Sequence, residues 1–111
     1  MTQSDVPAAT ALDALDLVAY QSGAVVSRTL LKRTGGTITL FAFDAGQGLS
    51  EHTAPFDALV HVLDGEADVM IAGTSVRVAA GQTVLLPAHQ PHAVTAPVRF
   101  KMLLTMIRSA T

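Results

Sequence analysis

Residues 46–65 read GQGLSEHTAPFDALVHVLDG, and residues 81–92 read GQTVLLPAHQPH. Both stretches begin with Gly-Gln and lead through short mixed runs to a histidine, His52 in the first and His92 in the second. Neither has the capping residue and the helical spacing that begin a helix. Three of the four histidines lie at or near the turn-rich parts of these stretches, and His61 lies in an apolar run between them. We therefore expect the two stretches to organise both the fold and the site.

Short apolar runs separated by turn residues extend outward from these two stretches. Gly-Gly at 35–36, Asp-Gly at 64–65 and the proline at 87 are strong turn or stop signals. We predict strands over residues 24–31, 37–43, 58–63, 67–71, 75–78, 83–86, 92–95 and 98–107. About eight short strands without a long helical period indicate an all-β fold, either an antiparallel sandwich or a small antiparallel barrel.

The length and composition of the chain limit its organisation. The 111 residues suit one domain. We expect residues 1–23 to form an N-terminal tail or arm and residues 24–111 to form the barrel domain. Half of the residues are hydrophobic, 14% are charged, and the mean hydropathy is +0.42. This surplus of apolar side chains predicts either a large interior or an apolar face covered by a second subunit, and we expect a homodimer.

The charge pattern argues against several classes of partner. The net charge is -2 and no basic stripe is present, so nucleic acid and anionic membranes are poor partners. The chain has no cysteine, which removes disulfides, thiolate metal sites and cysteine nucleophiles. No segment has the pattern of a signal peptide or a membrane-spanning run of about 18 apolar residues. We expect a cytoplasmic protein whose partner is a small molecule.

The spacing of the two stretches resembles the motifs of the cupin family. The first cupin motif is G-x5-H-x-H-x3-4-E-x6-G, and in register with it lie Gly46, His52 and Gly65. The second motif is G-x5-P-x-G-x2-H-x3-N, and in register with it lie Gly81, Pro87 and His92. The resemblance covers roughly residues 36–107 and is to the small single-domain, conserved-barrel cupins. It implies an antiparallel β-barrel, or double-stranded β-helix, of the jelly-roll type.

The resemblance also implies a metal site, which this sequence holds only in part. In the family, two histidines and a glutamate of the first motif and one histidine of the second hold a metal ion. Here His52 and His92 remain, and Ala54 and Ala58 stand at the other two positions. Two imidazoles can ligate Zn, Fe, Mn, Ni or Cu. We predict that the two histidines face one pocket, where they either hold a divalent metal ion or remain as a polar pair bonded to water.

Four further side chains near these positions are candidates for the site. Alternation along residues 58–63 turns Ala58 inward and His61 outward, so His61 is a poor ligand unless a bulge reverses the strand. His89 replaces the glycine of the second motif, in a loop, where it either reaches the pocket mouth as a ligand or proton carrier or is simply solvated. Glu51 and Asp57 flank His52 and either orient its imidazole or serve as solvated loop and turn residues.

Three functional hypotheses follow, and they differ in whether the pocket is used. The first is a cupin barrel that binds a small molecule, with His52 and His92 at the polar end of an apolar pocket and with dioxygenation, isomerisation or decarboxylation as the implied chemistries. The second is a metal-free barrel that binds or senses a ligand. The third is a structural dimerisation domain. The sequence leaves open whether the protein is an enzyme. Candidates for the pocket lining are Phe43, Phe56, Met70, Met102 and Met106.

Overall fold

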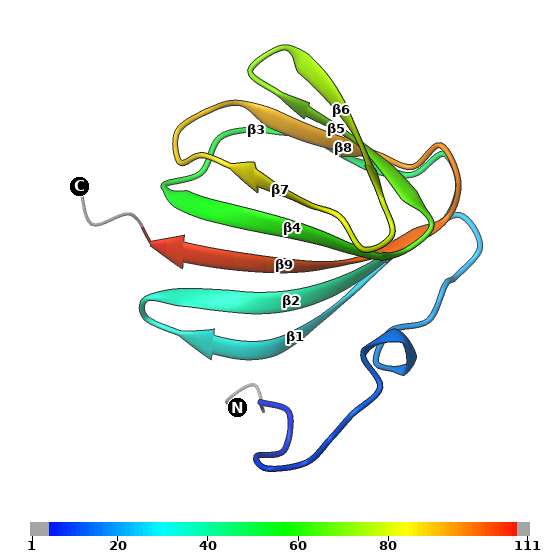
Figure 1. Cartoon of the computed structure of the whole chain (residues 1–111), viewed down its shortest axis with the longest axis vertical. Coiled ribbons are helices and arrows are strands. Elements are labelled where there is room, and N and C mark those ends of the chain that lie inside the picture. Colours follow the sequence, from blue (N-terminus) through cyan, green and yellow to red (C-terminus); the bar gives the residue numbers. More distant parts are fainter. Residues whose placement is uncertain (1–4, 109–111) are drawn as a thin grey trace.

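The structure, a computed structural model, describes residues 5–108 and consists of two antiparallel β-sheets that face each other (Figure 1). One sheet has five strands in the order β1-β2-β9-β4-β7, and the other has four in the order β3-β8-β5-β6. The strands, in chain order, are β1 (Val25–Arg33), β2 (Gly36–Phe43), β3 (Gly48–His52), β4 (Phe56–Asp64), β5 (Glu66–Ile71), β6 (Thr74–Ala79), β7 (Thr83–Leu86), β8 (His92–Thr95) and β9 (Phe100–Arg108), and a short 3₁₀ helix, η1 (Ala14–Asp16), precedes them.

The expected all-β jelly-roll fold is confirmed. Each run that the sequence predicts to be extended forms a strand, and the turns fall at the predicted glycines and prolines. In their hydrogen bonding the two sheets stay separate, so the described strands form two facing layers and do not close into one cylinder. Within residues 5–108, no helix is long and apolar enough to cross a membrane.

Strand β3 is the element that the sequence pattern did not predict. Only Leu49 is apolar among its last four residues, so no hydrophobic alternation marks it. It forms because its backbone pairs with β8, where Gly48 lies opposite Thr95 and Leu49 opposite Val94. The register shifts between Leu49 and His52, as at a β-bulge. This pairing brings the two motif stretches side by side.

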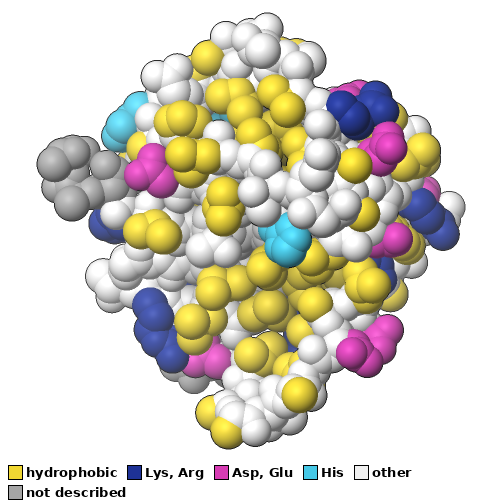
Figure 2. Space-filling view, viewed as in Figure 1, with side chains coloured by type: hydrophobic (Ala, Val, Ile, Leu, Met, Phe, Trp, Pro, Cys, Tyr) yellow, Lys and Arg dark blue, Asp and Glu magenta, His cyan; other side chains and the backbone are white. Residues whose placement is uncertain are grey.

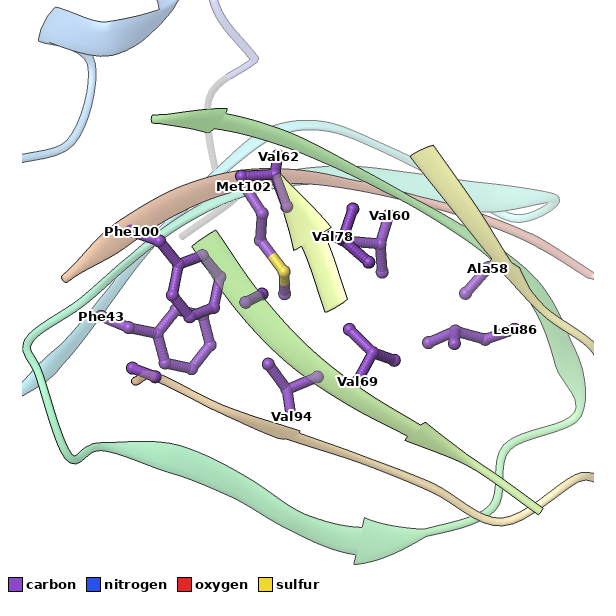
Figure 3. Close-up of a cluster of buried hydrophobic side chains, with 12 residues drawn as sticks. Phe43, Ala58, Val60, Val62, Val69, Val78, Leu86, Val94, Phe100 and Met102 are labelled. Carbon is purple, nitrogen blue, oxygen red and sulfur yellow. The ribbon is translucent and has the colours of Figure 1, made fainter. Parts of the chain in front are cut away.

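The hydrophobic core fills the space between the sheets (Figure 3). Alternation along β4 buries Ala58, Val60 and Val62 and leaves Leu59 outside with 43% of its surface exposed, as the sequence predicts. At one end of the core the rings of Phe43 and Phe100 stack with their centroids 4.5 Å apart. The residues on the inner faces of the sheets are therefore those at every second position along a strand.

The segment before β1 covers part of the outer face of the five-stranded sheet. Val18 is buried there against Leu40 and Ala42 of β2. The Tyr20 hydroxyl donates a hydrogen bond of 2.6 Å to the Asp64 carboxylate. Burial of the ring, and then this hydrogen bond, raise the pKa of Tyr20. Part of the arm expected over residues 1–23 is thus packed against the sheet, while its first four residues lie outside the described part.

Candidate functional site

Strands β3 and β8 place His52 and His92 next to each other. The two residues are cross-strand partners at the ends of these strands in the four-stranded sheet. On β8 the alternation that buries Val94 also turns His92 toward the interior, where only 8% of its surface is exposed. His52 is more exposed and lies at the open end of the same interior. The structure therefore brings together two imidazoles that are 40 residues apart in the chain.

The hydrogen bonds of the two rings define which nitrogens face each other. His52 Nδ1 lies 2.8 Å from the carbonyl oxygen of Ser50, and His92 Nδ1 lies 3.1 Å from that of Gln90. A carbonyl oxygen only accepts, so in each ring Nδ1 carries the proton and donates it. In the neutral rings both Nε2 atoms then carry lone pairs. These two Nε2 atoms are 3.2 Å apart, with ring planes at 69°.

Two lone pairs at this separation need an electron-poor partner, either a proton on one ring or a metal ion between them. Two imidazoles on one tetrahedral ion, with metal–nitrogen bonds of about 2.0–2.1 Å, place their nitrogens about 3.3 Å apart. The observed 3.2 Å between the Nε2 atoms is close to that value. Histidine ligands of metals also commonly donate their second ring N–H to a carbonyl oxygen, which is the pattern here.

The two histidines form the polar end of a cavity of about 50 Å³ between the sheets. All of its other lining side chains are apolar. The lining residues are Leu49, His52, Ala54, Phe56, Ala58, Val60, Leu86, His92, Val94, Met102, Leu104 and Met106. Ala54 and Ala58 occupy the positions of the two missing family ligands, and both line this same cavity.

The remaining polar candidates lie outside the cavity lining. His61 lies on the outer face of β4, in register with Leu103 and Thr83, as the strand alternation predicts. His89 is exposed in the loop before β8, has a φ of 66°, and donates its backbone N–H to the Ala54 carbonyl oxygen over 2.8 Å.

The two carboxylates beside His52 also point elsewhere. Asp57 accepts a hydrogen bond of 2.9 Å from the backbone N–H of Ala88, so it anchors the loop that leads to His92. Glu51 is exposed and does not line the cavity.

The apolar candidates divide between cavity, core and surface. Phe56, Met102 and Met106 line the cavity as anticipated, whereas Phe43 packs in the core and Met70 is 40% exposed on the other sheet. Other lining residues were not anticipated, namely Leu49, Leu86, Val94 and Leu104. Their sequence signal is the ordinary alternation of an inward-facing strand, which does not separate cavity from core.

The residues present fit a metal ion with only part of its coordination from protein. Among residues 5–108 there is no group of three or more histidine, aspartate or glutamate side chains that could hold an ion. The two Nε2 atoms converge, each ring is oriented by the hydrogen bond of its Nδ1 to a backbone carbonyl, and Ala54 and Ala58 line the same cavity. An ion there would complete its coordination with water or with donors from a bound molecule.

Comparison with known proteins agrees with the fold. The family model described as "Cupin domain" matches residues 39–107, which is more than half of the chain. The chain belongs to the cupin family. A comparison with curated protein sequences gives no match.

Several solved structures are similar to this cupin over most of its length. A conserved protein of unknown function from Streptococcus pyogenes is 37% identical, with coverage of 97% of this chain and 95% of that one and a TM-score of 0.91. A cupin superfamily protein from Desulfitobacterium hafniense is 27% identical, with coverage of 98% and 100% and a TM-score of 0.89. A conserved barrel domain protein from Leptotrichia buccalis is 40% identical over 85% of this cupin and 46% of that chain, with a TM-score of 0.83.

Proposed function

We propose that this cupin binds a small molecule at a divalent metal ion held by Nε2 of His52 and Nε2 of His92. The observation that supports it is the convergence of the two Nε2 atoms at 3.2 Å, each in a ring whose Nδ1 is bonded to a backbone carbonyl. Imidazole nitrogens suit Zn, Fe, Mn, Ni and Cu, whereas Ca and Mg prefer oxygen donors. We therefore assign the site to the first group.

Each part of the pocket has a defined task in this proposal. The carbonyl oxygens of Ser50 and Gln90 fix the orientation of the two rings, so little motion is needed when the ion binds. The apolar walls exclude water and hold the hydrocarbon part of the ligand. A divalent ion held by the two histidines would supply Lewis acidity toward an oxygen atom of the ligand. The open coordination positions are where the ligand joins.

The metal proposal predicts a specific pattern of losses in a titration. Purified metal-free protein, titrated with Zn²⁺ at pH 7.5 in a calorimeter, should bind one ion per chain. His52→Gln and His92→Gln should each weaken binding by at least about tenfold, because even the loss of an outer hydrogen-bond partner costs 10–100-fold in affinity. His61→Gln is the matched control, since His61 lies on the outer face of β4, away from the cavity. Equal losses in all three variants, or no binding by wild type, would refute the site.

A metal-free ligand-binding barrel is the second candidate function. It is favoured by the two alanines that replace family ligands in the cavity. In this case the unprotonated Nε2 atoms accept hydrogen bonds from a hydroxyl or N–H group of the ligand. A ligand that binds equally well with Zn²⁺ and with a chelator present would support this candidate over the first.

We also propose that two copies of this cupin associate through an uncovered part of the five-stranded sheet, called here the outer patch. It consists of Leu59, His61, Leu85 and Ile107, and the three apolar residues are 43%, 54% and 61% exposed. Leu59 and Leu85 are cross-strand partners. Figure 2 shows hydrophobic side chains exposed on this view of the molecule, many of them below a histidine near the middle.

A second copy suits the outer patch because none of its four residues carries a carboxylate, an ammonium or a guanidinium group. A two-fold contact over these four residues would place apolar side chains against apolar side chains, with the exposed Asp57, in register with Ile107, beside it. Leu59 and Leu85 are about half exposed, so burial of each contributes about half of the 1.5–3 kcal/mol for a fully exposed leucine, about 0.7–1.5 kcal/mol. A charged partner protein would find no counter-charge on this patch.

The dimer proposal predicts a monomer when one charge is placed in the outer patch. Wild type should have the mass of a dimer in light scattering at micromolar concentration and pH 8. Leu59→Asp should be monomeric, because a two-fold contact would bury two carboxylates. Met70→Asp is the matched control: Met70 is 40% exposed, on the other sheet, and this variant should stay dimeric. A monomeric wild type, or a monomer from Met70→Asp alone, would contradict the proposed interface.

A further inference from the structure

The cavity is polar at one end only. Of its twelve lining residues, His52 and His92 alone have side chains with nitrogen or oxygen atoms, and these two are neighbours. A ligand with polar groups at both ends would bury one of them against Val60, Leu104 or Met102 without a hydrogen-bond partner. Burial of a polar group without a hydrogen-bond partner costs roughly 1–3 kcal/mol in proteins. The occupant therefore has one polar end and a hydrocarbon body.

The polar end of the occupant must also supply negative charge. No lining residue is an aspartate, glutamate, lysine or arginine, and both imidazoles are neutral ligands. A divalent ion held by them keeps its full charge in an apolar surrounding, which is unfavourable unless an anion accompanies it. In the cupin motif a glutamate stands at the position of Ala58, which is 4% exposed and lines the cavity here. The space beside the ion is thus open to a carboxylate from outside.

The volume limits the occupant to a small molecule. A cavity needs at least about 10–15 Å³ to hold one water molecule. The cavity of about 50 Å³ therefore has room for about four water-sized groups. That space suits a ligand of about four to six non-hydrogen atoms. The flexible side chains of Met102 and Met106 allow small adjustments of the wall.

We infer that the pocket takes a short-chain aliphatic monocarboxylate, whose carboxylate group fills the place left by the missing glutamate at position 58. This inference rests on the proposed metal site and adds the chemical class of its ligand. In such a complex His52 and His92 would hold the ion, and the carboxylate would supply the anionic ligand that the protein lacks. The hydrocarbon chain lies between the two sheets against the apolar walls.

The test compares an acid with its neutral isostere in the same protein. Zn²⁺-loaded wild type is titrated with isobutyrate and with isobutyramide in a calorimeter, while the methyl signals of Met102 and Met106 are followed by NMR. Isobutyrate should bind at least about tenfold more tightly than isobutyramide, because only the acid offsets the charge of the ion. Isobutyrate should also shift both methionine methyl signals. Succinate should bind at least about tenfold more weakly than isobutyrate, because its second carboxylate would be buried without a partner.

A variant tests the place of the carboxylate. Ala58→Glu supplies an internal carboxylate and should weaken isobutyrate binding by at least about tenfold while Zn²⁺ binding tightens. Ser75→Glu, exposed on the other sheet, adds the same charge and should change neither. The comparison of isobutyrate with isobutyramide in wild type decides the matter even if Ala58→Glu does not fold.

These experiments distinguish failure of the metal site from failure of the ligand class. If Zn²⁺ does not bind to wild type before any acid is added, the proposed metal site is wrong and the inference falls with it. If Zn²⁺ binds but isobutyramide equals isobutyrate, or the methionine signals do not move, the metal site stands and the monocarboxylate is overturned.

Discussion

Restoring the two missing ligand positions, with Ala54→His and Ala58→Glu together, should tighten Zn²⁺ binding by more than about 100-fold. Both alanines line the cavity into which His52 and His92 project. The double variant would present three imidazoles and one carboxylate, a complete tetrahedral set for zinc. Since the loss of a hydrogen-bond partner behind a ligand already changes affinity by 10–100-fold, the addition of two direct ligands should exceed that range. Calorimetry with a competing chelator measures the gain.

The same double variant should lose stability without metal and regain it with metal. Ala58 is 4% exposed in the core cluster, so a glutamate there buries a carboxyl group among apolar side chains. The melting temperature of the metal-free variant should therefore fall below that of wild type, and Zn²⁺ should raise it, because an ion that binds only the folded state stabilises it.

Adding His92→Gln to the double variant is the control, and it should remove most of the gain in affinity. An affinity within tenfold of wild type would mean that positions 54 and 58 do not converge on the histidine pair.

Gly65→Ala should destabilise the fold by about 2–5 kcal/mol, more than the same change at another turn glycine. Gly65 has a φ of 74°, and an added Cβ would overlap the carbonyl oxygen of Arg99 and lie 3.0 Å from Phe100 Cα. These are backbone atoms beside the start of β9, a strand held between β2 and β4, so they have little freedom to move. The left-handed backbone costs an alanine about 1–2 kcal/mol, and overpacking adds about 1–3 kcal/mol.

Gly73→Ala separates these two contributions. Gly73 has a φ of 84° but nothing lies within 4 Å of an added Cβ. Gly73→Ala should therefore lower the free energy of unfolding only by the cost of the left-handed backbone, about 1–2 kcal/mol. Urea unfolding of both variants gives the two free energies of unfolding. If the losses were equal, close packing against the start of β9 would not be the reason for glycine at position 65.

Much of the fold could be predicted from the sequence because strand formation and strand parity are local. The alternation over residues 58–63 indicates that Ala58 and Val60 face inward and that His61 faces outward, and the structure agrees. Strand β3 was missed because its inner and outer residues do not differ in polarity. It exists because β8 provides a partner for its backbone.

The candidate site was predictable in its residues and unpredictable in its geometry. Motif register alone singled out His52 and His92, and their ligation of a metal ion stays a prediction. The sequence by itself determined eight of the nine strands, the side chains on them that point inward and the two histidines to test as a pair. Only the tertiary structure decided that their Nε2 atoms meet at 3.2 Å and which of the inward side chains form the cavity walls. The physical reason is that the period of a strand orients each side chain relative to its own backbone, whereas a cavity depends on how two sheets from distant parts of the chain pack together.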